Sequence, residues 1–189
     1  MVKMLKFAGV AAFKDDKLAG FLNEKETQGL NWVIGDVKRR VLTMNSMLKD
    51  DKLISIEVIR ANTQIEPRLE GDNLSFIIHV EEEGALVDQQ SVNHLKAKSK
   101  KIVDYLRKVE EKNEELIEEE IKLAMAKVQG DIQADILGFG QALQKKSPEK
   151  WNEVKEKWEE LFPNIDYEVK VTAKIIKTNL KKGTYQSKD

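Results

Sequence analysis

The period of the hydrophobic pattern changes twice along this chain, which limits its possible folds more than any other feature. Up to about residue 90, apolar and polar side chains alternate, as around Ile54, Ile56 and Val58, and this is typical of half-buried strands. Up to Leu143 the apolar residues then recur every three to four positions, as in helices, and alternation returns over 165–175. This order predicts an α+β domain, with long helices packed on one face of an antiparallel β-sheet.

The first elements are predicted to be a β-hairpin and two longer strands. Residues 5–13 and 18–22 are apolar enough for paired strands, and Asp15 and Asp16 suit the tight turn between them. Pro67 indicates an edge or a bulge, because proline has no N–H for a neighbouring strand. The inward face of the returning strand is predicted to be Leu74, Phe76, Ile78 and Val80.

A short helix is predicted directly after the hairpin. Asn23 suits its N-cap, since the side chain can accept a hydrogen bond from the first turn. Glu24 and Glu26 would lie in that turn, where the helix dipole favours acidic groups. We expect the helix to end within residues 29–35, which begin and end with glycine.

Two further helices are predicted before the last strand. The first runs from about Ser91 to Leu143, with a bend at Gly130. Its apolar stripe includes Ile102, Leu106, Val109, Leu116, Ile117, Ile121, Ala124 and Val128. The second begins at Ser147 and Pro148, a capping serine followed by proline at the first helical position. Its predicted buried stripe is Trp151, Val154, Trp158 and Leu161.

Length and composition bound the class of protein. A chain of 189 residues suits a single domain spanning 1–189, with a frayed tail over 181–189. Its 32 basic and 33 acidic side chains nearly cancel, so there is no general attraction to nucleic acid or to an anionic membrane. With no cysteine, this stretch has no disulfide, thiolate nucleophile or lipid-modified cysteine. The start of the chain lacks an export signal and a transmembrane span, so we expect this fragment to be soluble.

No arrangement of side chains predicts catalysis, a metal or a cofactor. His79 is expected to face solvent, and His94 has no partner at ligand spacing. Asp131 and Asp135 are one helical turn apart and could share a cation, although Asp131 more simply offsets exposed backbone near Gly130. The acidic runs 81–83 and 118–120 are interpreted as solvated faces, and the basic run 96–101 lacks the interleaved aromatic residues that a nucleic-acid site would have. Gly138-Phe139-Gly140 lacks the rest of a phosphate loop, so these glycines are expected to let another element approach closely.

Three functional classes therefore stay open on the residues alone. A binding or assembly role is the default. The alternative is a stand-alone module that captures a peptide or small ligand in a groove between sheet and helices. The third is an uncharacterised hydrolase that uses carboxylates.

Three stretches together resemble a known family. They are residues 12–32, residues 56–59, and the segment that runs from Ala134-Asp135-Ile136-Leu137-Gly138-Phe139-Gly140 through Trp151 and Trp158 to Phe162-Pro163. Their order and spacing resemble the C-terminal domain of the C subunit of bacterial spore germination receptors, the GerAC/GerBC lipoprotein family. The resemblance covers about Phe7 to Leu180.

The resemblance implies a non-catalytic scaffold domain in a receptor that responds to small nutrients. Family members are lipoproteins on the outer face of the spore inner membrane, where they work with the integral-membrane A and B subunits. Their signal peptide and lipid-modified cysteine would lie upstream of this chain, so the lipid anchor would be the domain's only tie to the membrane. We therefore expect an excised domain; the alternative is a truncated paralogue in the cytoplasm.

The resemblance also suggests where a partner subunit would bind. Asp15, Asp16, Glu24 and Glu26 lie in the most family-like stretch, and we expect their rim to be a subunit contact. The simpler alternative is that they serve only the hairpin turn and the helix cap. The family pattern further implies tight backbone geometry or core positions for Gly20, Gly29, Trp32, Phe139, Trp151 and Trp158.

Overall fold

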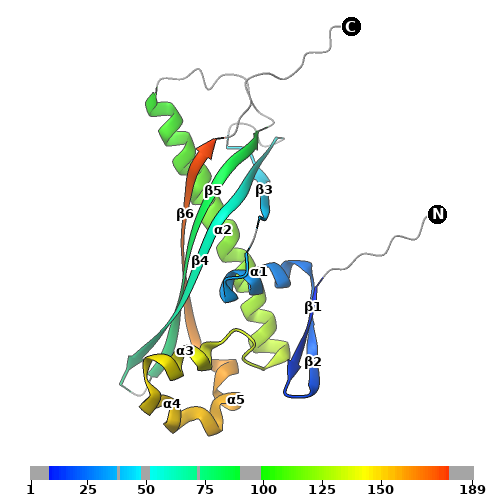
Figure 1. Cartoon of the computed structure of the whole chain (residues 1–189), viewed down its shortest axis with the longest axis vertical. Helices are drawn as coiled ribbons and strands as arrows, with labels where there is room; N and C mark the ends of the chain where they lie inside the picture. The colour runs from blue at the N-terminus through cyan, green and yellow to red at the C-terminus, as the bar shows by residue number, and fades with distance from the viewer. Residues whose placement is uncertain (1–8, 38, 48–51, 72, 90–98, 179–189) are drawn as a thin grey trace, which may run out of the picture. The chain divides into compact units, whose positions relative to one another are not determined.

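The computed structural model describes residues 9–37, 39–47, 52–71, 73–89 and 99–178 (Figure 1). The predictions for residues 5–8, His94, the basic run at 96–98 and the tail 181–189 lie outside these residues. Its helices and strands are β1 (Val10–Lys14), β2 (Lys17–Leu22), α1 (Glu24–Ile34), β3 (Val41–Asn45), β4 (Leu53–Glu70), β5 (Asn73–Gln89), α2 (Ser99–Lys127), α3 (Phe139–Lys146), α4 (Pro148–Val154), α5 (Trp158–Leu161) and β6 (Asp166–Thr178). The α+β class is confirmed.

The chain divides into two compact units. Unit 1 comprises Met1–Asp36, Asn62–Val80 and Glu115–Val171, and unit 2 comprises Val37–Ala61, Glu81–Glu114 and Thr172–Asp189. Strands β4, β5 and β6 and helix α2 each contribute one segment to both units. The single domain expected over residues 1–189 stays a prediction.

The predicted hairpin and the helix after it are confirmed. Strands β1 and β2 pair antiparallel, and Asp15 takes a left-handed conformation in the turn between them. The Asn23 side chain accepts from the backbone N–H of Glu26, and the Glu26 carboxylate accepts from the N–H of Asn23. This reciprocal capping box starts α1. Helix α1 ends at Gly35 in the left-handed conformation, whereas Gly29 lies buried inside the helix.

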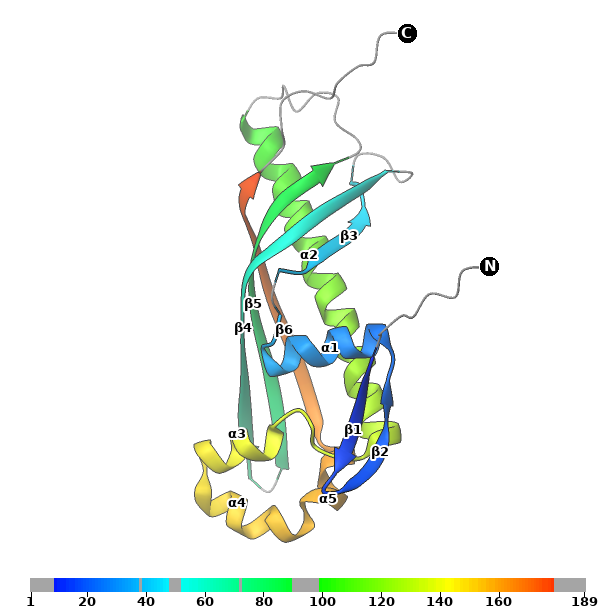
Figure 2. The same cartoon turned by 45° about the vertical axis from the view of Figure 1, so that its right-hand side comes forward.

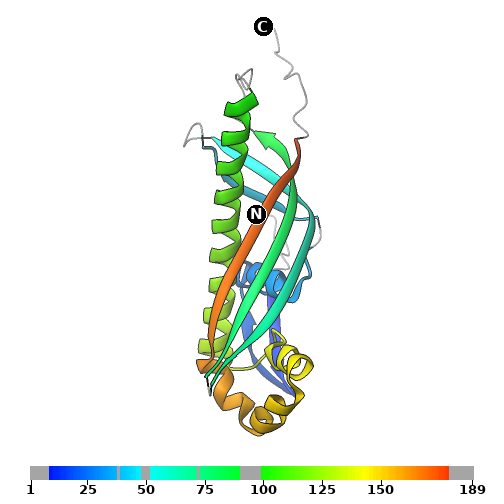
Figure 3. The same ribbon diagram turned by 90° about the vertical axis from the view of Figure 1, so that its left-hand side faces the viewer.

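The four-stranded sheet has the order β3-β4-β5-β6. Strands β3 and β4 pair antiparallel, but β5 and β6 point the same way in Figures 1 and 3, so β6 joins in parallel. This differs from the all-antiparallel sheet that we expected. The reason is the connection: a strand that follows a helix running back along the sheet re-enters in the direction of the strand before the helix.

The long helix ends earlier than its apolar stripe predicts. Helix α2 passes into a π-helical turn at Val128–Ile132, and Gln133 then takes a left-handed conformation. The Gln129 side chain donates to the carbonyl oxygens of Phe162 and Ile165, at 3.0 and 2.8 Å. The predicted continuation to Leu143 is therefore wrong. The later apolar residues belong to the separate helix α3, which follows a turn over 133–138.

The last predicted helix is likewise broken. Ser147 accepts from the N–H of Lys150 and starts α4, as expected. The chain then continues through short 3₁₀ turns and α5 to β6. Of the predicted stripe, Trp158 is buried, Trp151 and Val154 are half-buried and Leu161 is exposed. Phe162, which the stripe omits, is fully buried.

An aromatic cluster forms the core at one end of unit 1. Phe76 of β5 stacks on Phe139 of α3 with ring centroids 4.5 Å apart, and Phe139 meets Phe162 edge to face at 5.8 Å. Trp151 and Trp158 meet at 5.3 Å. A side chain on Gly140 would lie 3.0 Å from both indole rings, so this glycine permits the close approach that the sequence predicted.

Candidate functional site

Asp135 organises the turn that carries the Asp-Ile-Leu-Gly-Phe-Gly motif. Its Oδ1 accepts from the N–H groups of Gly138 and Phe139, and its Oδ2 accepts from the N–H of Gly140 and from Trp158 Nε1, at 2.6 to 3.0 Å. One carboxylate thus caps α3 and ties its first turn to the tryptophan cluster. The side chain is fully engaged by backbone and indole donors, so the motif has a structural role.

A groove of about 1030 Å³ lies beside this turn, wholly within unit 1. One wall is β4 from Thr63 to Pro67, and the other is the segment 135–142 together with Lys145 and Lys146 of α3. Val33 and Ile34, at the end of α1, close one part of it. The groove lies between sheet and helices, where the sequence-based alternative expected a ligand.

The two carboxylates that line the groove already have partners. Glu66 Oε2 lies 3.1 Å from Nε2 of His79, and Glu66 Oε1 lies 3.4 Å from Arg68. The hydrogen bond from His79 lowers the pKa of Glu66, and the positive charges of Arg68 and Lys146 lower it further. His79 was predicted to face solvent; its side chain is 36% exposed and, in addition, pairs with Glu66.

The structure separates the four acidic residues that were expected to form one rim. Asp15 and Asp16 occupy the turn of the hairpin, whereas Glu24 and Glu26 start α1 at its other end (Figure 2). The six residues of β2 between them span about 20 Å. Glu26 also serves as the reciprocal cap of α1. This geometry does not support one continuous contact formed by all four residues, and their role in a subunit contact stays a prediction.

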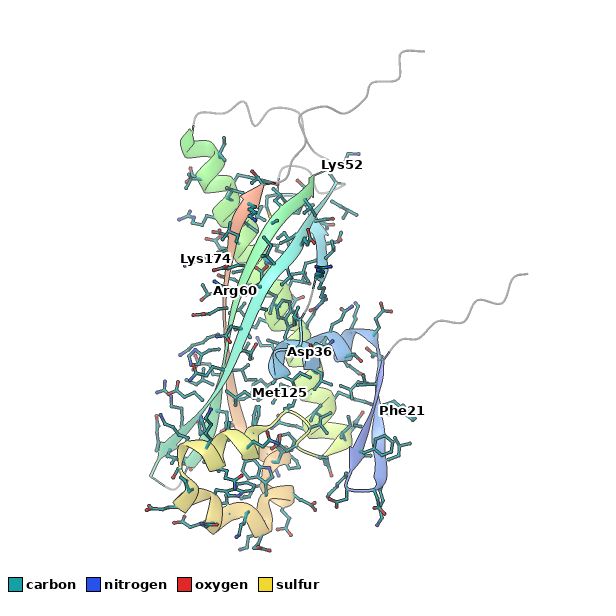
Figure 4. The ribbon with its side chains drawn as sticks, in the orientation of Figure 1. Phe21, Asp36, Lys52, Arg60, Met125 and Lys174 are labelled. Atoms are coloured by element: carbon teal, nitrogen blue, oxygen red, sulfur yellow. The ribbon has the colours of Figure 1, made fainter. Side chains whose placement is uncertain are left out.

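The hairpin exposes apolar side chains that the sequence reasoning did not single out. Phe13 pairs with Leu18 across the two strands, and Ala11 pairs with Phe21. Phe13, Leu18 and Phe21 are 56%, 51% and 65% exposed, and Figure 4 shows Phe21 pointing away from the hairpin. The inner face carries Ala12 and Leu22, both buried.

No group of histidine and acidic side chains that could hold a metal ion occurs among the described residues. Asp131 pairs with Lys127 at 2.6 Å, and Asp135 is engaged as described above. The structure therefore does not bring these two carboxylates to one cation. It also corrects the interpretation of Asp131, whose partner is a lysine ammonium group and not backbone near Gly130.

Unit 2 contains a buried carboxyl group. Glu82 of β5 is 1% exposed and Asn113 of α2 is fully buried, and Asn113 Nδ2 donates to Glu82 Oε2 at 2.9 Å. Glu82 Oε1 and Asn113 Oδ1 are buried acceptors without a hydrogen-bond partner in the described part of unit 2. Burial raises the pKa of Glu82 to about 7, although the bond from Asn113 opposes this. A proton on Glu82 would give the pair the donor that it lacks.

We expect the free energy of unfolding to fall as the pH rises from about 5 to about 8. In this range the unfolded chain has released the proton of Glu82, while the folded chain keeps it until its pKa of about 7. The loss in free energy of unfolding therefore grows from the ordinary glutamate pKa of the unfolded chain, 4.5, up to the folded pKa of about 7. Above that pH it levels off at about 3 kcal/mol. Urea denaturation at pH 5 and pH 8 should show this loss in the parent protein and little of it in Glu82→Gln. An equal slope in Glu82→Gln would contradict the assignment, and Glu81→Gln, at an exposed neighbour, is the control.

Comparison with known proteins places the chain. A family model described as "Spore germination B3/GerAC like, C-terminal" matches residues 8–179. The chain belongs to this family. The spore germination proteins YndF and B3 of Bacillus subtilis (strain 168) are each 31% identical to it, over 176 and 169 residues. Both alignments cover 89% of this chain, but only 41% and 43% of those proteins.

A solved structure confirms the family fold. The crystal structure of the GerBC protein superposes with a TM-score of 0.77 at 29% identity, covering 90% of this chain and 52% of that one. The chain thus spans less than half the length of the curated relatives that it matches and about half of GerBC. Within the residues that the structure describes, no helix is both long and apolar enough to cross a bilayer.

Proposed function

We propose that this chain is a non-catalytic domain of a spore germinant receptor lipoprotein subunit and takes part in receptor assembly and nutrient-induced germination. The observation that carries the proposal is the family match over residues 8–179. The likeness to GerBC over 90% of the chain supports it. The partners would be the integral-membrane A and B subunits, at the outer face of the spore inner membrane. A lipid anchor upstream of this segment would hold it there.

The use of the polar side chains supports a scaffold over an enzyme. Asp135 caps a helix, and Glu120 accepts from the indole Nε1 of Trp32 at 2.8 Å. Glu110 and Glu114 accept from the backbone N–H groups of Ile175 and Ala173. These carboxylates stabilise the fold, because both oxygens of Asp135 and one oxygen of each of the three glutamates accept from backbone or ring donors. A nucleophile or general base needs an oxygen that is open to a substrate.

The experiment is an in-frame deletion of this domain in the organism that encodes it. We expect normal spore yield and heat resistance, together with loss of germination in response to the nutrients of its receptor. Restoring the intact gene should restore the response. Spores that lack the domain and still germinate at the parental rate with every nutrient that the parent recognises would refute the proposed role.

We further propose that the hairpin contacts a membrane subunit of the receptor. Its outer face exposes Phe13, Leu18 and Phe21, and the acidic turn lies at one end. Exposed apolar groups of this size are typical of protein contacts. An acidic turn would add charge complementarity to a basic partner.

Charge reversal at the turn tests this contact. We expect Asp15→Lys with Asp16→Lys to reduce recovery of the A and B subunits with the affinity-tagged C subunit by about tenfold. The domain should stay folded, with a loss of about 1 kcal/mol because residue 15 takes the left-handed conformation. Glu26→Lys is a poorer probe, because it also removes a helix cap worth about 1 kcal/mol. Glu156→Lys with Glu168→Lys, at exposed positions elsewhere, is the matched control. Equal recovery in both double variants would exclude the turn from the contact.

A further inference from the structure

We propose that the groove of unit 1 binds an extended, acidic peptide segment of a partner protein, which adds as a strand to the edge of β4. The proposal rests on the proposed function only in that a receptor partner would supply the segment. The binding itself is a property of this domain. Three observations carry it: an uncovered strand edge, a groove of suitable size along that edge, and a surplus of positive charge in the lining.

The first observation is the uncovered edge. Strand β3 is in register with only Leu53–Glu57 of β4. Along 63–67, no other described strand pairs with this side of β4. Pro67 marks the direction of the edge, since proline is tolerated where its missing N–H points away from the sheet. Backbone groups point the same way at every second residue, so counting back from Pro67 we infer that those of Ile65 and Thr63 point to this edge. The N–H of Val58 donates to Arg40 on the same side, which requires one extra residue between positions 58 and 63. The change of buried positions from Ile54, Ile56 and Val58 to Pro67 indicates such a bulge.

The opposite edge of the sheet shows how this protein covers a strand. On β6 the N–H groups of Ala173 and Ile175 donate to the carboxylates of Glu114 and Glu110 of α2, at 3.0 and 2.9 Å. Proteins generally protect strand edges in such ways, because an open edge pairs with other chains. At the edge of β4, Thr63 already donates its hydroxyl to the carbonyl oxygen of Trp32, at the end of α1. No such contact among the described residues covers Ile65, so the open edge that strand addition requires begins there.

The second observation is the size of the groove. The wall from Thr63 to Pro67 is five residues long, about 16 Å of extended chain. The volume of about 1030 Å³ lies between this wall and α3, which is room for a strand of four or five residues with its side chains. Ile65 and Ile136, both half-buried, add apolar surface. An extended peptide could therefore place alternate side chains against both walls.

The third observation is charge. Four donors hold Asp135, and His79 and Arg68 hold Glu66. Lys145 and Lys146 are exposed and lie within 4.0 Å of no carboxylate oxygen among the described residues, although the charge of Lys146 also acts on Glu66. The lining therefore offers a ligand two lysine ammonium groups, whereas both of its carboxylates are already engaged by other residues. The segment that best complements it carries acidic side chains, or its C-terminal carboxylate, at the α3 end.

The probe is a fluorescein-labelled hexapeptide of alternating threonine and valine that ends in two glutamates. Anisotropy titration should give saturable binding, and the same peptide ending in two lysines should bind about tenfold more weakly. Two further peptides carry N-methyl groups, one on its odd residues and the other on its even residues. One of the two should bind about tenfold more weakly, because its methyl groups replace the N–H groups that would bond to β4. Lack of saturable binding, or equal binding of all peptides, would overturn the proposal.

Two variants locate the binding. Lys145→Glu with Lys146→Glu should exchange the preference, so that the lysine peptide binds better than the glutamate peptide. Lys155→Glu with Lys157→Glu, outside the groove, should leave it unchanged. Ile65→Pro removes an edge N–H and should weaken binding about tenfold; if this variant unfolds, the N-methylated peptides test the same bond.

A second copy of the chain is the competing occupant. Sedimentation of the parent and of the Lys145→Glu, Lys146→Glu variant separates the two outcomes. The proposal would be overturned in favour of self-association if the parent were a dimer, the variant were a monomer and the parent did not bind the peptide. A monomer that binds the glutamate peptide would support it. Neither result depends on the germination assay, so failure here leaves the proposed receptor role to its own test.

Discussion

Replacing Gly29 with alanine is expected to destabilise unit 1 by about 3 kcal/mol or more. The new Cβ would overlap the carbonyl oxygen of Glu120 in α2, and it would lie 2.6 Å from the carbonyl carbon and 2.8 Å from Cβ of Ala124. Two of these three atoms belong to the backbone of a helix, which cannot move aside as a side chain can. The same interface holds the bond from Trp32 Nε1 to Glu120, so separating α1 from α2 would also break a buried hydrogen bond.

Urea denaturation followed by circular dichroism measures this effect, and Gly130→Ala is the matched control. Gly130 is exposed, and a Cβ there would have open space around it. The control should raise stability by up to about 1 kcal/mol, since alanine restricts the unfolded chain more than glycine does. If Gly29→Ala were as stable as the parent, the close packing of α1 on α2 would be wrong.

Replacing Asp135 with alanine is expected to cost about 3 kcal/mol. The substitution removes the acceptor for three backbone N–H groups at the start of α3 and for the indole of Trp158. A single lost helix cap costs about 1 kcal/mol, and each further unsatisfied donor adds to this. Phe139 and Gly140 would lose their fixed positions in the aromatic cluster, so near-ultraviolet circular dichroism should weaken along with stability.

Two substitutions control this prediction. Asp135→Asn retains one carbonyl oxygen and should lose about half as much stability, because its amide nitrogen cannot accept from Gly140 or Trp158. Asp131→Ala removes only an exposed ion pair with Lys127 and should cost less than about 1 kcal/mol. Comparable losses in Asp131→Ala and Asp135→Ala would show that Asp135 does not organise the turn.

The residues of the Gly-Phe-Gly motif illustrate how far sequence reasoning reached at the candidate site. The sequence indicated that both glycines admit a close neighbour. This holds for Gly140, where the tryptophans fill that place, but Gly138 has no such neighbour and instead takes a left-handed backbone conformation. It did not indicate that Asp135 holds the turn, because the carboxylate's partners include an indole 23 residues away. The groove was foreseen only as a location between sheet and helices. Its lining combines α1, β4 and α3, which periodicity cannot bring together.

The buried pair of Glu82 and Asn113 was missed for a related reason. Glu82 lies in an acidic run that the pattern assigns to a solvated face. Its two neighbours in the run do not share its burial, since Glu81 is exposed and Glu83 pairs with Arg60 on the surface. Successive side chains of a strand point to opposite faces, so Glu82 faces helix α2 while Glu81 and Glu83 point to the other side.

The sequence by itself determined the elements whose signals lie within a few residues. These include the hairpin turn at Asp15, the N-cap at Asn23, the Ser147 cap and the alternation of β6. Hydrogen bonds and side-chain periods of this kind are local, so they can be predicted from neighbours along the chain.

Only the tertiary structure decided where α2 ends, which glycine packs against a helix and which strand edge stays open. The apolar stripe continues past Ile132 without a break, yet Gln129 and Asp135 bind groups more than 20 residues away and turn the chain there. Such bonds form only after distant segments have come together. Their energy then outweighs the weak local preference for continuing the helix.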